Sequence, residues 1–225
     1  MFSQRTAGPA VKRVRGIIFD LDGTLTPVRS VWQYIHEALG TWETQGSLSL
    51  RAFLAGKITY DEFARRDVSA WSGIPRRRVE EIVAGIPYHS GVQETVTALK
   101  EKGVKLALLS SGLDILAARV AAELGFDVFV ANGLGFTDER LDGRVHIRVA
   151  WDGKPDHLGS ICELLGTAPS ETAAVGDSHG DVPLFSRVGL GIAVNAEPDV
   201  SAYAHVSIEC RDLRALLPVL APYLP

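Results

Sequence analysis

Two aspartates, Asp20 and Asp22, stand directly after an apolar run with one residue between them. Carboxylates with this spacing at a strand end can coordinate a hard cation, attack an electrophile or transfer protons. An EF-hand loop does not explain the pair, because Thr24, Leu25 and Val31 occupy the positions where it needs an oxygen ligand, a glycine and a glutamate. The sequence also contains no P-loop and no GxGxxG, so nucleotide-binding loops do not explain it either.

Further polar residues follow other apolar runs. Ser110 follows the run at 104–109, and Asp177 closely follows the run at 172–175. Helical patterns separate these runs, and strands that alternate with helices predict an α/β protein with a parallel sheet covered on both faces. Ligands of such sheets bind beyond the carboxyl ends of the strands. We therefore expect Asp20, Asp22, Ser110 and Asp177 to converge on one site.

The remaining segments complete this outline. Apolar runs at 127–131 and 189–194 predict two more strands of the sheet. Residues 27–90 have apolar positions at helical spacing, which predicts a small helical insert. Asp142-Gly143 separates short apolar segments within 134–147, and we expect it to form the turn of a hairpin beside the main sheet.

The composition is that of an ordinary globular protein. The chain has 225 residues, of which 46% are hydrophobic and 22% charged, and its formal net charge of −4 argues against a nucleic-acid-binding surface. Two distant cysteines without CxxC spacing form neither a zinc ribbon nor a disulfide framework. There is no membrane-length apolar run and no signal peptide, so we expect a cytoplasmic protein with no membrane partner.

Four ordered segments carry a family resemblance. FDLDGTLTP at 19–27, LLSSG at 108–112, Lys154 in GKPDHL and GDSHGD at 176–181 resemble the motifs of the haloacid-dehalogenase-like phosphohydrolase superfamily. The insert and the C-terminal segments resemble its phosphoserine phosphatase branch. The resemblance implies a Rossmann-like α/β core at 14–26 and 91–225 and a helical cap at 27–90. From the composition of residues 1–13, which lack an apolar stretch, we expect a flexible tail.

The resemblance also implies a reaction, the hydrolysis of a small phosphorylated metabolite. Asp20 would attack phosphorus and form an aspartyl-phosphate, while Asp22 would serve as general acid and then general base. A second aspartate is absent from dehalogenases, so Asp22 favours phosphoryl chemistry. Mg²⁺ would be held by the Asp20 carboxylate, the Asp22 carbonyl and the Asp177 carboxylate.

Other motif residues would assist this chemistry. Ser110, Ser111 and Lys154 would bind the phosphate, with Lys154 also keeping Asp20 ionised. Asp181 would either support the metal site from outside its first layer of ligands or cap a helix.

The insert departs from the phosphoserine phosphatase pattern. Those enzymes grip the serine ammonium and carboxylate with a glutamate and an arginine of the cap, whereas Arg29 stands at the glutamate position and Asp67, preceded by Arg66, stands at the arginine position. Gly180 likewise stands where the branch commonly has asparagine. Either the cap aligns differently, or Arg29 and Arg66 receive the acidic group of a phosphorylated carboxylic acid such as phosphoglycolate. A phosphotransferase on the same scaffold and a non-enzymatic binding module are the alternatives.

Overall fold

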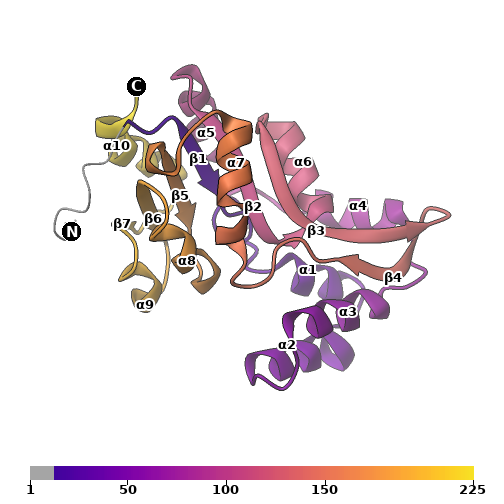
Figure 1. The fold of residues 1–225 in the computed structure, drawn as a ribbon. Coiled ribbons are helices and arrows are strands. Elements are labelled where there is room, and N and C mark those ends of the chain that lie inside the picture. Colours follow the sequence, from indigo (N-terminus) through magenta and orange to yellow (C-terminus); the bar gives the residue numbers. More distant parts are fainter. Residues whose placement is uncertain (1–12) are drawn as a thin grey trace.

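The protein is an α/β protein built on one seven-stranded sheet (Figure 1). The structure, a computed structural model, describes residues 13–225, so nearly all of the expected tail at 1–13 lies outside the described residues. The strand order is β4-β3-β2-β1-β5-β6-β7, and every neighbouring pair is parallel except β3 and β4. The strands are β1 (Gly16–Phe19), β2 (Lys105–Leu113), β3 (Val128–Thr137), β4 (Arg140–His146), β5 (Thr172–Gly176), β6 (Leu190–Val194) and β7 (Val206–Ile208).

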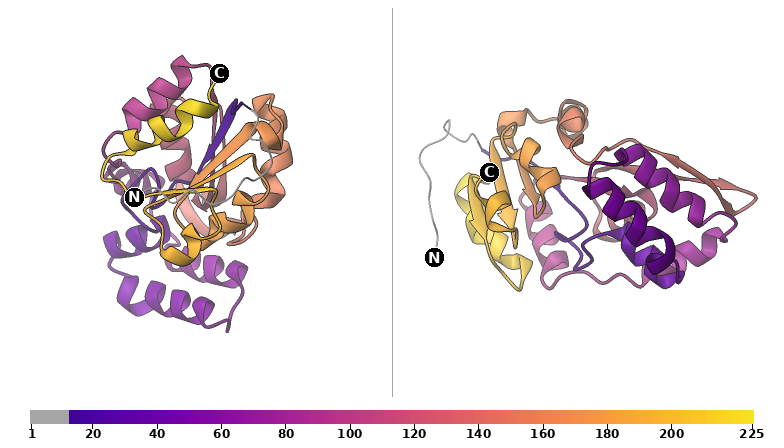
Figure 2. Two further views of the ribbon diagram at one scale, coloured as in Figure 1. Left: turned by 90° about the vertical axis from the view of Figure 1, so that its left-hand side faces the viewer. Right: turned by 90° about the horizontal axis from the view of Figure 1, so that it is seen from below.

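Helices cover both faces of the sheet, because successive strand residues point to opposite sides. Ile17 and Phe19 belong to one apolar cluster, with residues of α5 (Val92–Glu101), α6 (Asp114–Leu124) and α10 (Leu216–Leu220). Ile18 belongs to the other cluster, which includes residues of α7 (Leu158–Leu165), α8 (Val182–Phe185) and α9 (Pro198–Ser201). The fully buried strands β1, β5 and β6 are therefore apolar on both faces apart from Thr172, as two-sided coverage requires. Figure 2 shows the helices on either side of the sheet.

The predicted fold class and the five predicted strands are confirmed, and β7 is a strand that the sequence analysis missed. The predicted hairpin is also present, as β3 and β4, but its predicted turn was wrong. Asp138 and Glu139 form the turn, both with positive φ (48° and 58°), whereas Asp142 and Gly143 lie inside β4. Asp142 Oδ1 accepts a hydrogen bond from the Arg144 N–H, so this side chain bonds to the backbone of its own strand rather than to a turn.

Residues 31–84 form the helical segment α1 (Val31–Ala38), α2 (Ser47–Leu54), α3 (Tyr60–Ala70) and α4 (Arg76–Ala84), with a π-helical turn at Trp42–Gly46. Ser30 and Thr59 cap α1 and α3 by accepting hydrogen bonds from backbone N–H groups in their first turns. Trp71, directly after α3, is fully buried and stacks against Trp32 of α1 with ring centroids 6.0 Å apart. Figure 1 shows this segment beside the hairpin β3–β4.

The hairpin tip is joined to the helical segment by backbone hydrogen bonds. Gly73 donates to the Leu141 carbonyl at 2.8 Å, and Leu141 donates to the Ile74 carbonyl at 2.9 Å. Arg76 donates to the Glu139 carbonyl at 2.8 Å. The segment is thus attached to the sheet through the hairpin as well as through its own two ends.

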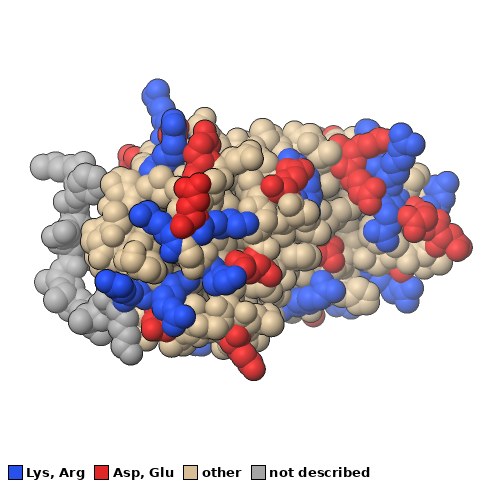
Figure 3. Space-filling view, turned by 90° about the horizontal axis from the view of Figure 1, so that it is seen from above, with Lys and Arg blue, Asp and Glu red and all other residues tan. Residues whose placement is uncertain are grey.

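Charges of both signs are interspersed on the surface in Figure 3. Among residues 13–225, no helix has the length and apolar character needed to span a bilayer.

Candidate active site

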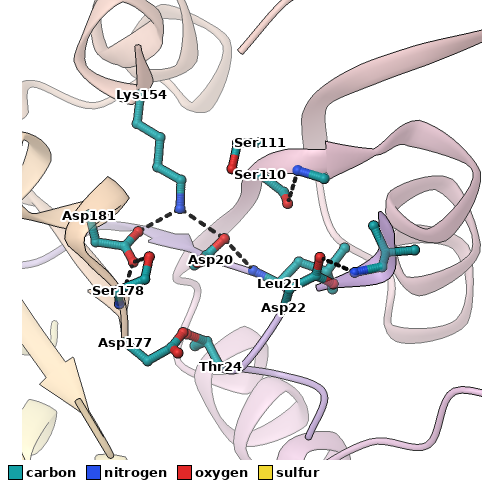
Figure 4. Close-up of polar contacts among 12 residues, drawn as sticks. Asp20, Leu21, Asp22, Thr24, Ser110, Ser111, Lys154, Asp177, Ser178 and Asp181 are labelled. Carbon is teal, nitrogen blue, oxygen red and sulfur yellow. Dashed lines mark hydrogen bonds and ion pairs between the residues drawn. The ribbon is translucent and has the colours of Figure 1, made fainter. Parts of the chain in front are cut away.

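The sheet brings the ends of β1, β2 and β5 together, because all three run parallel and in register. Phe19 of β1 lies opposite Leu108 of β2 on one side and Val175 of β5 on the other. The polar residues that follow these positions therefore share one edge of the sheet (Figure 4). Ser110 lies within β2 rather than after it, since the strand continues to Leu113.

Lys154 lies between two carboxylates of this edge. Its Nζ is 2.8 Å from Asp20 Oδ1 and 2.6 Å from Asp181 Oδ1 (Figure 4). Lys154 stands at the start of a short 3₁₀ helix (Lys154–His157) and is only 2% exposed. Burial opposes its charge, but the carboxylates of Asp181 and Asp20 raise the pKa of Lys154, so the ammonium stays charged.

Asp20 is held at one oxygen only. Oδ1 accepts a hydrogen bond from the Leu21 N–H at 2.7 Å and faces Lys154, whereas no hydrogen bond within the described residues engages Oδ2. Burial raises the pKa of Asp20 well above its ordinary value, and the Asp181 carboxylate raises it further, against the opposing effect of Lys154.

Asp177 is positioned by the turn after Asp22. Thr24 donates its hydroxyl to Asp177 Oδ1 at 2.7 Å. Gly23 has φ +84°, and a Cβ there would come within 2.2 Å of Asp177 Oδ2, so this turn requires glycine. Burial raises the pKa of Asp177 to about 6, against the lowering effects of the Thr24 hydrogen bond and the Lys154 and Arg29 charges.

Asp22 has one bound and one free carboxylate oxygen. Oδ2 accepts a hydrogen bond from the Val31 N–H at 2.9 Å, whereas the buried Oδ1 has no hydrogen-bond partner among residues 13–225. Burial raises the pKa of Asp22 to about 7, although the Val31 N–H opposes the shift. A carboxyl that titrates near neutral pH, with a free oxygen, suits a general acid and base.

The carboxylates of Asp20, Asp177 and Asp181 can be tested as a cation site. Each offers an oxygen within 4.8 Å of the others, and the mutual repulsion that contributes to the raised pKa of Asp20 is what a bound cation relieves. The ligands are hard oxygens, which suit a hard divalent ion. Asp181 is the least available of the three carboxylates for binding a cation. Lys154 donates to its Oδ1, and the Ser178 N–H and hydroxyl donate to its Oδ2, both at 3.0 Å.

Ser110 lies in the C-terminal part of β2. Its Oγ accepts a hydrogen bond from the Gly112 N–H at 2.9 Å. The Ser111 carbonyl beside it accepts bonds from Trp32, Tyr60 and Asn132, three residues that sequence reasoning missed as parts of a site. The sequence around each of these three residues does not indicate a site, because only the fold brings them together.

The structure does not bring the proposed cap charges together at this site. Arg66 is exposed and pairs with Glu62 at 2.9 Å, on the same helix. Asp67 is 1% exposed, and its Oδ1 lies 3.4 Å from His36 Nε2 inside the helical segment. Arg29 is exposed and close enough for its charge to lower the pKa of Asp177, so it alone of these residues acts on the site.

Comparisons with known proteins agree with this arrangement. A family model described as haloacid dehalogenase-like hydrolase matches residues 17–186. Phosphoserine phosphatase of Methanocaldococcus jannaschii is 33% identical over 207 residues, which cover 92% of this chain and 97% of that protein. The protein of the same name from Albidiferax ferrireducens is 34% identical over 214 residues, covering 92% and 89%. A solved phosphoserine phosphatase complex with bound substrate superposes with a TM-score of 0.80 at 31% identity, covering 92% and 99%.

Proposed function

The chain belongs to the haloacid dehalogenase-like hydrolase family and is a phosphatase, and from this premise we propose that it hydrolyses a small phosphate monoester through an aspartyl-phosphate on Asp20. The observation that carries the proposal is the asymmetry of Asp20. Lys154 and the Leu21 N–H hold Oδ1, which orients the carboxylate and leaves Oδ2 for attack.

The two steps use Asp20 and Asp22 in turn. Asp20 Oδ2 bonds to phosphorus as the ester P–O bond breaks, and protonated Asp22 gives its proton to the leaving oxygen. Asp22 then takes a proton from a water molecule that attacks the same phosphorus, and Asp20 leaves as a carboxylate. The unpartnered Oδ1 of Asp22 is the atom that we assign to both transfers.

We propose Mg²⁺ as the cofactor. Asp20, Asp177 and the Asp22 carbonyl would hold it, and Asp181 would fix Lys154 and the 178–181 turn beside it. When bound, the ion supplies positive charge against the phosphate and the acidic cluster. Ser110, Ser111 and Lys154 would contact the phosphoryl oxygens.

The helical segment at 27–90 is, in this proposal, a cap domain that covers the site, with 14–26 and 91–225 as the core. Trp151, three residues before Lys154, contacts Phe53 of α2 with ring centroids 5.9 Å apart. Tyr60 and Trp32 contact the Ser111 carbonyl on β2. These contacts support a closed cap that shields the reaction from bulk water.

Two substrate classes are consistent with this site. The relatives are named for phosphoserine, which makes it the first substrate to test. A phosphorylated carboxylic acid of the phosphoglycolate type is the second, because Arg29 is exposed, acts on Asp177 and would attract a second anionic group rather than an ammonium.

Phosphate release from a panel of phosphorylated metabolites tests the proposal. Phosphoserine, phosphoglycolate, phosphoglycerate and sugar phosphates are compared with Mg²⁺ and with EDTA, and Asp20→Asn is the control. We expect Mg²⁺-dependent release that Asp20→Asn abolishes, with a mass increase of one phosphoryl group on the rapidly quenched wild-type protein. Release by Asp20→Asn at the wild-type rate would contradict the nucleophile. Product that appears only when a second alcohol is added would indicate a phosphotransferase.

A further inference from the structure

One carbonyl oxygen beside the site accepts three hydrogen bonds. Ser111 O receives the Tyr60 hydroxyl at 2.5 Å, the Asn132 amide at 2.9 Å and the Trp32 indole N–H at 3.3 Å. Asn132 also donates to the Tyr60 hydroxyl oxygen at 3.1 Å. Side-chain donors rarely converge in this number on one main-chain carbonyl, since most backbone carbonyls of a sheet bond to neighbouring strands.

The same peptide unit contacts Ser110 at its other end. The carbonyl of Ser111 and the N–H of Gly112 belong to one amide, and that N–H donates to Ser110 Oγ at 2.9 Å. Because Ser110 Oγ accepts this bond, its own hydrogen is available to a phosphoryl oxygen. Donors at the carbonyl end polarise the amide and strengthen the bond at its N–H end. The space beside Gly112 is too small for a side chain, since a Cβ there would lie 2.9 Å from Asp22 Oδ2 and 3.0 Å from Ser110 Oγ.

The three donors come from two parts of the molecule. Trp32 and Tyr60 are on α1 and α3 of the proposed cap, whereas Asn132 is on β3 of the core. Asn132 is fully buried and fixed, because its Oδ1 accepts the Arg148 and Val149 N–H groups at 2.8 and 2.9 Å. Tyr60 is 9% exposed, and burial raises its pKa, so its hydroxyl remains a donor. Only the two cap donors can leave the carbonyl when the cap opens.

We propose that Tyr60 and Trp32 are positioning residues that couple cap closure to Ser110: when the cap closes, they polarise the Ser111–Gly112 amide and orient the Ser110 hydroxyl toward the phosphoryl group. The inference rests on the proposed function, because it assigns Ser110 to the phosphate. It adds that the cap takes part in phosphate binding through main-chain atoms of the core, without touching the phosphate.

A double-mutant cycle of Tyr60→Phe and Ser110→Ala tests the coupling. Tyr60→Phe alone lowers kcat about fivefold, the size expected for one buried hydrogen bond, with a smaller effect on KM. In the Ser110→Ala background the same change lowers kcat by less than about 1.5-fold, because the group that it positions is gone. Trp32→Phe gives the same pattern with a smaller effect. Tyr203→Phe, which removes the hydroxyl of an exposed tyrosine, leaves kcat unchanged.

Anion binding gives a second measurement that does not depend on turnover. Calorimetric titration with orthovanadate, which adopts the five-coordinate geometry of the transferring phosphoryl group, shows affinity lowered about fivefold by Tyr60→Phe, whereas inorganic phosphate affinity changes less. An equal loss of kcat in both backgrounds, or unchanged vanadate affinity in folded Tyr60→Phe, would overturn the coupling. A wild-type protein that releases no phosphate would instead count against the proposed function, and vanadate titration of the same variants would still decide the coupling.

Discussion

At the scale of single residues, Asp22 is the clearest case in which position decides chemistry. The first residue of α1 binds one carboxylate oxygen through the Val31 N–H, so the start of the helical segment fixes the orientation of the acid. In the part of the chain that the structure describes, the other oxygen is buried without a partner, a costly state that a site tolerates when substrate supplies the partner. The oxygen to which we assign proton transfer is thus left free by a hydrogen bond between the proposed core and cap.

The first prediction separates the role of Asp22 from that of Asp20. Asp22→Asn cannot protonate a leaving group, so hydrolysis of an alkyl phosphate falls by about 10²–10⁴-fold. With 4-nitrophenyl phosphate, whose leaving group needs no proton, we expect a burst of nitrophenol equal to the enzyme concentration and slow turnover afterwards, because water activation is also lost. Rapid-mixing absorbance measures the burst. Equal losses on both substrates, without a burst, would contradict the general-acid role.

At the scale of elements, the short loop before Lys154 packs directly on the turn that carries Asp177 and Asp181. A Cβ at Gly180 would lie 2.9 Å from the Trp151 carbonyl oxygen, closer than real Cβ contacts. The glycine therefore allows this loop to approach, which gives a physical reason for glycine at a position where the family resemblance leads us to expect asparagine.

The second prediction concerns this close approach. Gly180→Ala pushes the 150–153 loop away, lowers the free energy of unfolding by about 1–3 kcal/mol and reduces kcat, because Lys154 follows the loop. Gly159→Ala is the matched control. It adds the same methyl group to α7 where no atom lies within 4 Å, and stabilises the helix by about 0.5 kcal/mol. Chemical denaturation and steady-state kinetics measure both variants. A Gly180→Ala protein with unchanged free energy of unfolding and unchanged kcat would contradict the packing argument.

Strands β2 and β3 are linked by a carboxylate. Asp127 accepts bonds from the Leu106 N–H and the Lys105 ammonium, both at 2.9 Å. Burial works against the charge, but these two partners lower the pKa of Asp127 below its ordinary value. Its ionised form therefore stabilises the fold fully above the unfolded pKa, near 4, and this contribution is lost as the pH falls through the folded pKa.

The third prediction follows from that sign. Asp127→Asn keeps an acceptor oxygen for Leu106 but removes the charge, so it lowers the free energy of unfolding at pH 7 by about 0.5 kcal/mol, given that the side chain is partly exposed. The difference in free energy of unfolding between Asp127→Asn and wild type narrows as the pH falls below 4. Urea denaturation at several pH values measures it. Glu163→Gln, which removes the same charge from an exposed position on α7, controls for net charge, and a constant difference across the pH range would contradict the assignment.

At the scale of the whole molecule, the helical segment and the hairpin β3–β4 form a continuous structure. Arg76, the first residue of α4, lies with its guanidinium 3.7 Å from the centre of the Phe136 ring and pairs with Glu139 at 3.0 Å. Together with the backbone bonds to the hairpin tip, these contacts attach α4 to the end of the hairpin that lies farthest from Asn132.

The fourth prediction compares two neighbouring arginines. Arg76→Ala lowers the free energy of unfolding by about 1 kcal/mol and speeds hydrogen exchange at the Gly73 and Leu141 amides, because it removes the contact that joins α4 to the hairpin. Arg77 is 88% exposed, and its one ion pair within the described residues is with Glu81 on its own helix, so Arg77→Ala changes stability by less than about 0.5 kcal/mol. Identical exchange rates in the two variants would show that the backbone bonds alone attach the hairpin.

The sequence by itself determined the fold class and the residues at the carboxyl edge of the sheet. Apolar runs that end in Asp20, Ser110 and Asp177 predict parallel strands, and parallel strands must bring their ends together, so a local pattern was enough. The order of the motifs added the family. The sequence predicted that the hairpin exists but not where its turn lies, because Asp138-Glu139 lacks the glycine that usually marks such turns.

Only the tertiary structure decided how the helical segment meets that edge. Periodicity identifies a buried helix face but not its partner. Alignment with the family placed Asp67 among the substrate-specificity residues, whereas its Oδ1 lies 3.4 Å from His36 Nε2 within the segment. Likewise, Trp32, Tyr60 and Asn132 are distant in the chain and meet at one carbonyl only because α1, α3 and β3 pack around it. Local sequence specifies which residues can do chemistry, whereas the contacts between elements decide which of them face the same atom.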